Sequence, residues 1–207
     1  FIAAKTIAEH GGTILCLNRP SERAKAALED LKLKVPKKKD EEQFIAIDCD
    51  LMDFASVREA ADEITKKYPA LYALGNNAGI MLGKDEATKD GYDKQMQTNH
   101  LSHFLLTAKL LPLLKKGAAE YGDARVVTMS SGTRHGNSTG KVGAFADGKG
   151  GLEEKYFGKN SGNLGGNDVK MGALITGPQF DRYAQSKLAN SVFMHALHDK
   201  LQSSGDT

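Results

Sequence analysis

The sequence predicts an α/β fold with three layers, in which an open parallel sheet is covered by helices on both faces. Short apolar runs typical of buried parallel strands alternate along the chain with longer stretches of helical periodicity. Polar or glycine residues directly follow several of these runs, at the sheet edge where parallel α/β folds hold their ligands. The chain has 207 residues, enough for one sizeable core, so we expect residues 1–207 to form a single domain.

The first half of the chain alternates helix and strand. Ser21 is a favourable N-cap residue, and the apolar residues after it recur at helical spacing. Asp53 is expected to cap a helix in the same way. The elements expected here are a helix that ends at Gly11, a strand over residues 13–17, a helix from Ser21 to about Leu33, a strand over 44–47 and a helix over 54–68.

The second half continues the alternation but contains one long irregular segment. The expected elements are a strand over residues 71–75, a helix over 92–116, a strand over 124–129 and a helix that opens at Tyr183. Between the last two, residues 132–177 are rich in glycine, asparagine and lysine and have few apolar anchors. Long loops in compact domains are usually functional or disordered, so we predict a surface excursion that covers a ligand, with residues 152–157 as its packed anchor.

Composition and charge argue against several kinds of partner. Hydrophobic residues make up 40% of the chain and the net charge is +2, so neither nucleic acid nor an anionic membrane is indicated. The sequence has no apolar run long enough to span a bilayer. Cys16 and Cys49 fall in separate predicted strands, and we expect reduced core thiols and no metal site.

A tyrosine and a lysine lie at helical spacing near the end of the chain. Tyr183 and Lys187 are four residues apart, so on a helix they share one face. A neighbouring ammonium favours the phenolate form of a tyrosine, which makes such a pair suited to proton transfer. The spacing alone is also that of an ordinary solvated helix face, and other motifs have to decide between the two interpretations.

Three further motifs accompany this pair along the chain. They are Asn76-Asn77-Ala78-Gly79, the segment 98–106 around Asn99, and the strand 126–131 that ends at Ser131. Together with Tyr183 and Lys187 they resemble the short-chain dehydrogenase/reductase family, in the family's order. The wording of segment 98–106 and of the residues around Lys187 is most similar to the retinol-dehydrogenase-like branch. The resemblance covers nearly the whole chain and implies a Rossmann-type fold.

The resemblance implies hydride transfer between a nicotinamide and a carbonyl or alcohol of a lipophilic small molecule. Tyr183 is then the proton donor, and Ser131 hydrogen-bonds the substrate oxygen. Lys187 supports Tyr183 and binds the nicotinamide ribose. Asn99 distorts its helix and holds a water that leads to the lysine. His100 and His103 beside it are read as packing or capping residues, since no acidic or cysteine partners are spaced for a metal.

The cofactor expected from the resemblance is NADP(H), with NAD(H) the less favoured choice. The strand ending near residue 17 is followed by Asn18 and Arg19, with no carboxylate to read a ribose 2′-hydroxyl. A guanidinium pairs well with a 2′-phosphate, although Arg19 can also be a solvated loop residue. The remaining implied cofactor contacts are Asp50 and Leu51 at the adenine, Asn77, Ala78 and Gly79 through the close backbone, and Tyr183 with Lys187 at the ribose.

Several alternatives stay open at this stage. A light-dependent protochlorophyllide reductase carries an insertion of similar length in this place, although its active-site strand typically ends S-I-T and this one reads Ser130-Ser131-Gly132. Besides the oxidoreductase and the pigment reductase, the third alternative is a protein that binds NADP without turnover. A homodimer is included among the expected partners, and the compartment is open between the cytoplasm and an organelle matrix.

The family pattern extends beyond both ends of this chain. Phe1 begins directly in a helical pattern, where the family has a first strand and a glycine-rich phosphate loop before it. The family's later strands would follow Thr207. We therefore expect a fragment whose sheet has a gap at its centre, between the strands that end at Asn18 and near Gly75.

Overall fold

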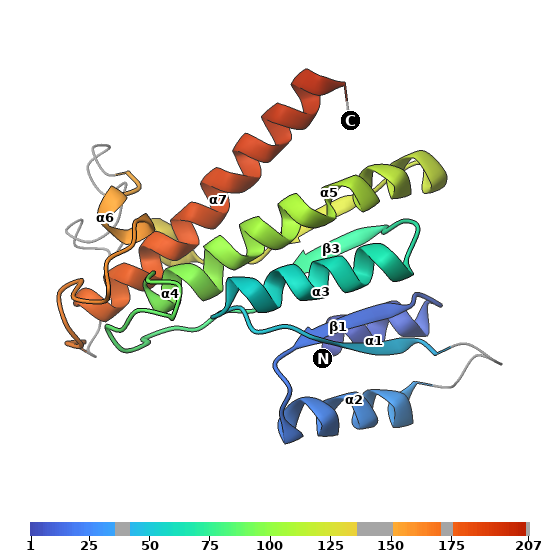
Figure 1. The fold of residues 1–207 in the computed structure, drawn as a ribbon, viewed down its shortest axis with the longest axis horizontal. Coiled ribbons are helices and arrows are strands. Elements are labelled where there is room, and N and C mark those ends of the chain that lie inside the picture. The colour runs from blue at the N-terminus through green and yellow to red at the C-terminus, as the bar shows by residue number, and fades with distance from the viewer. Residues whose placement is uncertain (36–41, 136–150, 171–175, 206–207) are drawn as a thin grey trace.

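The computed structural model describes residues 1–35, 42–135, 151–170 and 176–205. Helices and strands alternate over most of the chain, as predicted (Figure 1). Within the described ranges no helix is both long and apolar enough to cross a membrane. In chain order the elements are α1 (Ile2–Glu9), β1 (Ile14–Asn18), α2 (Glu22–Lys34), β2 (Phe44–Asp48), α3 (Phe54–Lys67), β3 (Ala73–Asn76), α4 (Lys94–Met96), a π-helix (Gln97–Leu101), α5 (Ser102–Tyr121), β4 (Arg125–Thr128), a 3₁₀ turn (Gly132–His135), α6 (Glu154–Phe157) and α7 (Pro178–Ser204).

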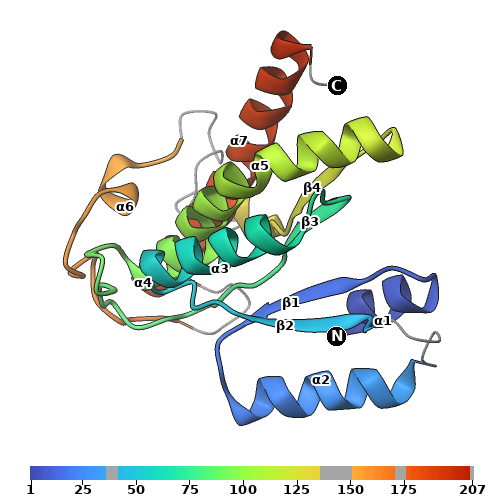
Figure 2. The ribbon, with the colours of Figure 1, turned by 45° about the vertical axis from the view of Figure 1, so that its right-hand side comes forward.

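Both faces of β1 pack against helices, which gives this part of the fold the expected three layers. Ile14 and Cys16 of β1 pack toward α1 and α2 in one apolar cluster. Leu15 and Leu17, which alternate with them, pack into a second cluster built on α3 and α5. Successive side chains of a strand point to opposite faces, so this division follows directly from the continuous apolar run of β1. In Figure 2, β1 and β2 lie between α2 and the layer of α3 and α5.

The strands form two parallel pairs, and the gap between them is the one that we expected at the centre of the sheet. β1 pairs with β2 from Ile14 opposite Phe44 to Asn18 opposite Asp48. β3 pairs with β4 from Ala73 opposite Arg125 onward. In the described part of the chain no ladder joins β1 to β3. The interruption falls between those two strands, where the family resemblance implies a further strand, and the shared apolar cluster of α3 and α5 still bridges both pairs.

α2 and α3 begin where the sequence predicted, because their caps are present, whereas α7 begins at Pro178, before the predicted start at Tyr183. The Ser21 hydroxyl accepts a hydrogen bond from Ala24 N–H at 3.2 Å, and the Asp53 carboxylate accepts one from Ala55 N–H at 2.9 Å. α5 packs on α3 and ends at Gly122, which has a left-handed backbone with φ +81°. These local signals are readable from sequence because each cap acts within one turn of its own helix.

The helix predicted over residues 92–116 has different bounds in the structure, and the distortion that the resemblance implies is present at Asn99. Regular helix starts at Lys94, gives way to a π-helix over Gln97–Leu101, and then runs on as α5 to Tyr121. The buried Asn99 lies within the π-helix. Single π-turns inside α-helices frequently occur at functional sites, so this distortion marks Asn99 as a residue whose position matters.

Cys16 and Cys49 are both free thiols, as expected. Burial raises the pKa of the Cys49 thiol to about 11, so it is protonated at neutral pH. The part of the long segment that the structure describes is anchored at Tyr156, which packs on Met96 and Ala189. Residues 136–150 and 171–175 of the predicted excursion lie outside the described residues.

Candidate active site

The carboxyl ends of β3 and β4 meet at one edge, and α7 crosses it. Met129 N–H, just after β4, donates to the carbonyl of Asn76 at 3.0 Å. The buried Asn76 amide in turn donates to the hydroxyl of Thr107 on α5 at 2.9 Å and to that of Thr128 on β4 at 3.3 Å. The end of β3 is therefore fixed to its neighbouring strand and to the helix above it.

Lys187 reaches this edge from α7. Its ammonium donates to the carbonyl of Met129 at 3.0 Å and lies 5.7 Å from the centre of the Tyr183 ring. The lysine is 4% exposed, and burial lowers its pKa. Tyr183 is half-buried one turn earlier on the same helix face, so the structure brings the two residues together as their spacing predicted.

Asn99 is completely buried, and both its side-chain oxygen and its amide nitrogen are hydrogen-bonded. Its oxygen accepts from Ile80 N–H at 2.8 Å, and its amide donates to the Ile80 carbonyl at 2.9 Å. The same amide donates to the Ser186 hydroxyl on α7 at 2.9 Å. One side chain thus ties the segment after β3 to the helix that carries Tyr183.

Gly79 lies where a side chain would obstruct this arrangement. A Cβ placed on Gly79 would be 3.2 Å from the Asn99 oxygen and 3.3 Å from the Lys187 ammonium. The backbone of residues 77–79 is exposed, so a ligand can approach it closely. Gly79, Asn99 and Lys187, which are distant in sequence, consequently lie around one small space.

Ser131 also follows β4 at this edge, and it is half-buried. Its hydroxyl accepts from Thr133 N–H at 3.3 Å, in the short 3₁₀ turn. The preceding Ser130 points the other way and donates to the Lys187 carbonyl at 2.7 Å. Of the two serines predicted at the strand end, Ser130 therefore fixes α7 against β4, whereas Ser131 is held by its own turn.

Sequence reasoning missed Asn190 and Ser186, which support the site from α7. Asn190 is buried; its amide donates to the Met129 carbonyl at 3.0 Å, and its oxygen contacts Nδ1 of His100 at 3.1 Å. Ser186 and Asn190 are four residues apart, so a polar stripe at helical spacing was the available signal. His100 serves as a packing residue, in agreement with the prediction, with its ring 6.0 Å from that of Phe193.

His103 lies directly behind Asn99. Its Nδ1–H donates to the Asn99 carbonyl at 3.1 Å. Burial and the nearby Lys187 charge lower the pKa of His103 to about 4, so the ring is neutral at neutral pH. The predicted reading of His103 as a packing or capping residue agrees with this contact. Among the described residues no cluster of histidine, cysteine, aspartate and glutamate is arranged to hold a metal ion.

The residues predicted to contact the adenosine lie at the carboxyl ends of β1 and β2. Asn18 and Arg19 are exposed, and Cys49 N–H donates to the Asn18 carbonyl at 2.9 Å. The Asp50 carboxylate accepts from Met52 N–H at 2.9 Å, so one of its oxygens closes a local turn. The Leu51 carbonyl accepts from the Ser102 hydroxyl at 2.6 Å, which links this strand end to the start of α5.

Comparison with known proteins agrees with this architecture. An uncharacterized oxidoreductase of Schizosaccharomyces pombe is 33% identical over 207 residues, covering 99% of this chain and 53% of that protein. Retinol dehydrogenase 12 of Bos taurus is 36% identical over 165 residues, covering 80% of this chain and 42% of that protein. The chain thus spans about half the length of the curated relatives it matches.

Solved structures show the same fold. A crystal structure of an uncharacterized protein from Mycobacterium paratuberculosis matches with a TM-score of 0.67 and 30% identity, covering 99% of this chain and 59% of that one. A short chain dehydrogenase of Shigella flexneri, solved in complex with NADP, matches with a TM-score of 0.60 and 23% identity over 98% of this chain and 66% of that one. The family model for short chain dehydrogenases matches residues 1–154. The resemblance drawn from the four motifs is therefore confirmed, and the chain belongs to the short chain dehydrogenase family.

Proposed function

We propose that this chain carries the catalytic residues of an NADP-dependent oxidoreductase that acts on a carbonyl or alcohol of a lipophilic small molecule. The observation that carries the proposal is the gathering of Tyr183, Lys187, Asn99 and Gly79 around one space at the end of β3 and β4. Because the chain spans about half of its relatives, the proposal concerns the whole protein of which it forms part.

The residues present fit a nicotinamide nucleotide. Gly79 leaves its backbone accessible beside the Lys187 ammonium, which is a suitable donor for ribose hydroxyls. When bound, the nicotinamide supplies or accepts the hydride. Asn99 fixes the segment that this backbone belongs to, through its two bonds with Ile80. The protein itself contributes by positioning these groups before the substrate binds.

Tyr183 is the proposed proton donor in the reductive direction. Its hydroxyl transfers a proton to the substrate oxygen, and the Lys187 ammonium beside the ring stabilises the phenolate that this leaves. Ser131 donates a hydrogen bond to the same oxygen, which stabilises charge as it develops there. The buried Lys187 acts at a short distance from the ring in a site where water screens its charge little.

The choice of NADP(H) rests on Arg19. This residue is exposed at the carboxyl end of β1 and follows Asn18, so neither of these two positions has a carboxylate that would read a ribose 2′-hydroxyl. In the full-length protein NADPH should bind at least about tenfold more tightly than NADH, which corresponds to roughly 1.4 kcal/mol. Arg19→Ala should remove most of that difference, whereas Arg23→Ala, an exposed arginine on α2, should leave it unchanged. Equal affinities in the unmutated protein would refute the assignment.

A lipophilic substrate is proposed from the relatives. The names of two of them, retinol dehydrogenase 12 and human polyprenol dehydrogenase, describe long isoprenoid alcohols. The human protein is 33% identical over 135 residues, covering 65% of this chain and 40% of that protein. A panel of aliphatic and isoprenoid aldehydes and alcohols of increasing length is the direct test, with the rate of NADPH change as the measurement.

The decisive experiment on the mechanism compares two tyrosines. Tyr183→Phe keeps the ring and removes the proton, so turnover should fall about 100-fold or more while the NADPH dissociation constant stays nearly the same. Tyr72→Phe is the matched control, because Tyr72 is exposed and lies away from this edge. Lys187→Ala should impair both turnover and cofactor binding. Near-normal turnover by Tyr183→Phe would show that the active site has been assigned to the wrong residue.

A further inference from the structure

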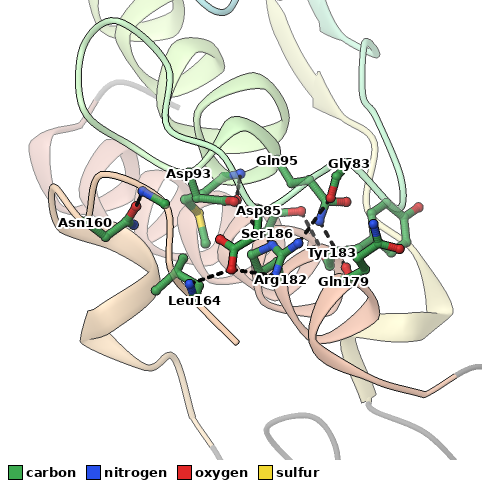
Figure 3. Close-up of polar contacts among 12 residues, drawn as sticks. Gly83, Asp85, Asp93, Gln95, Asn160, Leu164, Gln179, Arg182, Tyr183 and Ser186 are labelled. Atoms are coloured by element: carbon green, nitrogen blue, oxygen red, sulfur yellow. Dashed lines mark hydrogen bonds and ion pairs between the residues drawn. The ribbon is translucent and has the colours of Figure 1, made fainter. Parts of the chain in front are cut away.

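A completely buried arginine precedes Tyr183 on α7. Arg182 donates from one guanidinium nitrogen to the Gly166 carbonyl at 2.9 Å and from another to the Gly83 carbonyl at 3.1 Å. Figure 3 shows its guanidinium among the side chains of Asp85 and Asp93. The residue next to the proposed proton donor therefore binds two segments that are far apart in the sequence.

The segment around Gly166 is folded about the carboxylate of Asp85. One carboxylate oxygen accepts from Leu164 N–H and from Gly166 N–H, each at 2.7 Å. Gly165 and Gly166 have φ of +104° and +87°, in the left-handed region that favours glycine. Asp85 and Arg182 therefore both bind Gly166: the aspartate accepts a hydrogen bond from its N–H, and the arginine donates one to its carbonyl.

A second contact of the same kind lies on the other side of Tyr183. The Gln185 amide donates to the Gly151 carbonyl at 3.2 Å, and its oxygen accepts from Glu153 N–H at 3.1 Å. Gln185 is 3% exposed. The described segment 151–170 is therefore fastened to α7 by the residues on either side of Tyr183.

Arg182, Asp85 and Asp93 form a buried cluster of charges that tolerates little change in geometry. The side chains of Arg182, Asp85 and Asp93 are 0%, 4% and 0% exposed, so one cation is shared by two buried carboxylates. Burial raises the pKa of Asp93 despite the neighbouring guanidinium. Taking such groups out of water is costly, and a buried ion cluster is weak support for stability by itself. What the planar guanidinium does provide is a fixed direction for several hydrogen bonds at once.

We propose that Asp85 and Arg182 form a latch that fastens segment 151–170 to α7 and thereby holds Tyr183 in its working position. Arg182 is a positioning residue in this scheme, because it acts on Tyr183 through the backbone of α7. The role of Tyr183 itself rests on the function proposed above, but the latch is a property of the fold that can be measured without turnover.

The first test removes the charge of Asp85. In Asp85→Asn, hydrogen exchange of the Leu164 and Gly166 amides should speed up about tenfold, because a charge-assisted bond is replaced by a weaker neutral one. The ring signal of ¹³C-labelled Tyr183, identified by its loss in Tyr183→Phe, should shift in the same variant. Glu86→Gln is the matched control, since Glu86 is the next carboxylate in the chain but is exposed and pairs with Lys94. Unchanged exchange in Asp85→Asn overturns the latch.

The second test leaves every charged group in place and strains only the backbone. Gly166→Ala forces an alanine into a left-handed conformation at a position with no heavy atom within 4 Å of the added Cβ. Gly122→Ala does the same at φ +81° with equally open surroundings, at the end of α5. Both should lose similar stability, but only Gly166→Ala should move the Tyr183 signal and lower kcat by about threefold or more. If the two variants have the same kcat and tyrosine signal, the positioning role is wrong.

The outcomes separate the latch from the proposed function. Faster amide exchange with no change in the Tyr183 signal means that the segment is fastened without positioning the tyrosine, and this overturns the proposal. Faster exchange and a shifted signal, in a protein that turns over none of the aldehydes and alcohols in the panel, support the latch and refute the proposed function. In an active protein, the NADPH dissociation constant should be unchanged in Asp85→Asn while kcat falls.

Discussion

Replacing Asn99 by alanine tests how the two halves of the site are held together. The buried side chain makes three hydrogen bonds, at 2.8 Å and 2.9 Å to Ile80 and at 2.9 Å to the Ser186 hydroxyl. With a net contribution of about 1 kcal/mol for each bond, Asn99→Ala should lower the free energy of unfolding by about 3 kcal/mol. Ser186→Ala removes one of the three, together with its own bond to the Tyr183 carbonyl, and should cost about 1–2 kcal/mol.

The assay is urea unfolding of the full-length protein, with free energies taken from the midpoint and slope. Asn77→Ala is the matched control, because Asn77 is an exposed asparagine one residue after β3 and should change stability by less than about 0.5 kcal/mol. A domain is stable by only about 5–15 kcal/mol, so a loss near 3 kcal/mol is easily resolved and still leaves a folded protein. If Asn99→Ala costs no more than Asn77→Ala, the reasoning from these three bonds is wrong.

Two glycines give further predictions. Gly117→Ala should destabilise the protein by about 2 kcal/mol or more despite the roughly 1 kcal/mol that alanine gains in a helix, because its Cβ would lie 2.0 Å from the Leu71 carbonyl oxygen. Ala119→Gly, on the exposed face of the same helix, measures the difference in helix propensity between alanine and glycine alone. Urea unfolding gives the change in the free energy of unfolding for both variants. Gly79→Ala should leave the unfolding midpoint nearly unchanged but weaken NADPH binding about tenfold, measured by calorimetry, because its Cβ would crowd the Lys187 ammonium at 3.3 Å.

The parts of the fold that sequence predicted well are those set by local rules. The caps at Ser21 and Asp53 act within one turn of their helices, and the pairing of Tyr183 with Lys187 follows from helical spacing alone. The strand ends were displaced by one or two residues; β3, for example, begins at Ala73 instead of residue 71. Strand ends are decided by pairing with another segment, which a single sequence does not display.

The parts that sequence did not predict depend on contacts between distant segments. Arg182 and Asp85 are separated by almost half of the chain, and each reads in the sequence as an ordinary surface charge. Their burial follows from the docking of segment 151–170, in which the left-handed Gly166 donates to the Asp85 carboxylate. The π-helix at Asn99 is similar, because it accommodates an amide that must reach Ile80 and Ser186 at once.

The buried His103 and the half-buried Asp181 give the stability of this protein opposite dependences on pH. His103 has a folded pKa of about 4, lowered from 6.5, so the unfolded chain binds more protons between those values and stability is lost as pH falls through them. Asp181 has a folded pKa of about 6, raised from 3.8 by burial and by Glu153, so the folded chain binds more protons there and stability is lost as pH rises. The contributions are about 3 kcal/mol for the histidine and, allowing for partial exposure, about 2 kcal/mol for the aspartate.

Because His103 and Asp181 contribute to the pH dependence of stability with opposite signs, a separate variant is needed to measure each contribution. Asp181→Asn removes the contribution of the aspartate and keeps that of His103. The free energy of unfolding of this variant should therefore rise with pH between about 4 and 6.5 more steeply than that of the unmutated protein. His103→Gln leaves the aspartate term, so its curve should rise less steeply or fall. Other carboxylates titrate equally in both variants and cancel when the slopes are compared. His198→Gln, an exposed histidine on α7, should follow the unmutated curve. Parallel curves for Asp181→Asn and His103→Gln would show that neither side chain is held in the buried state described here.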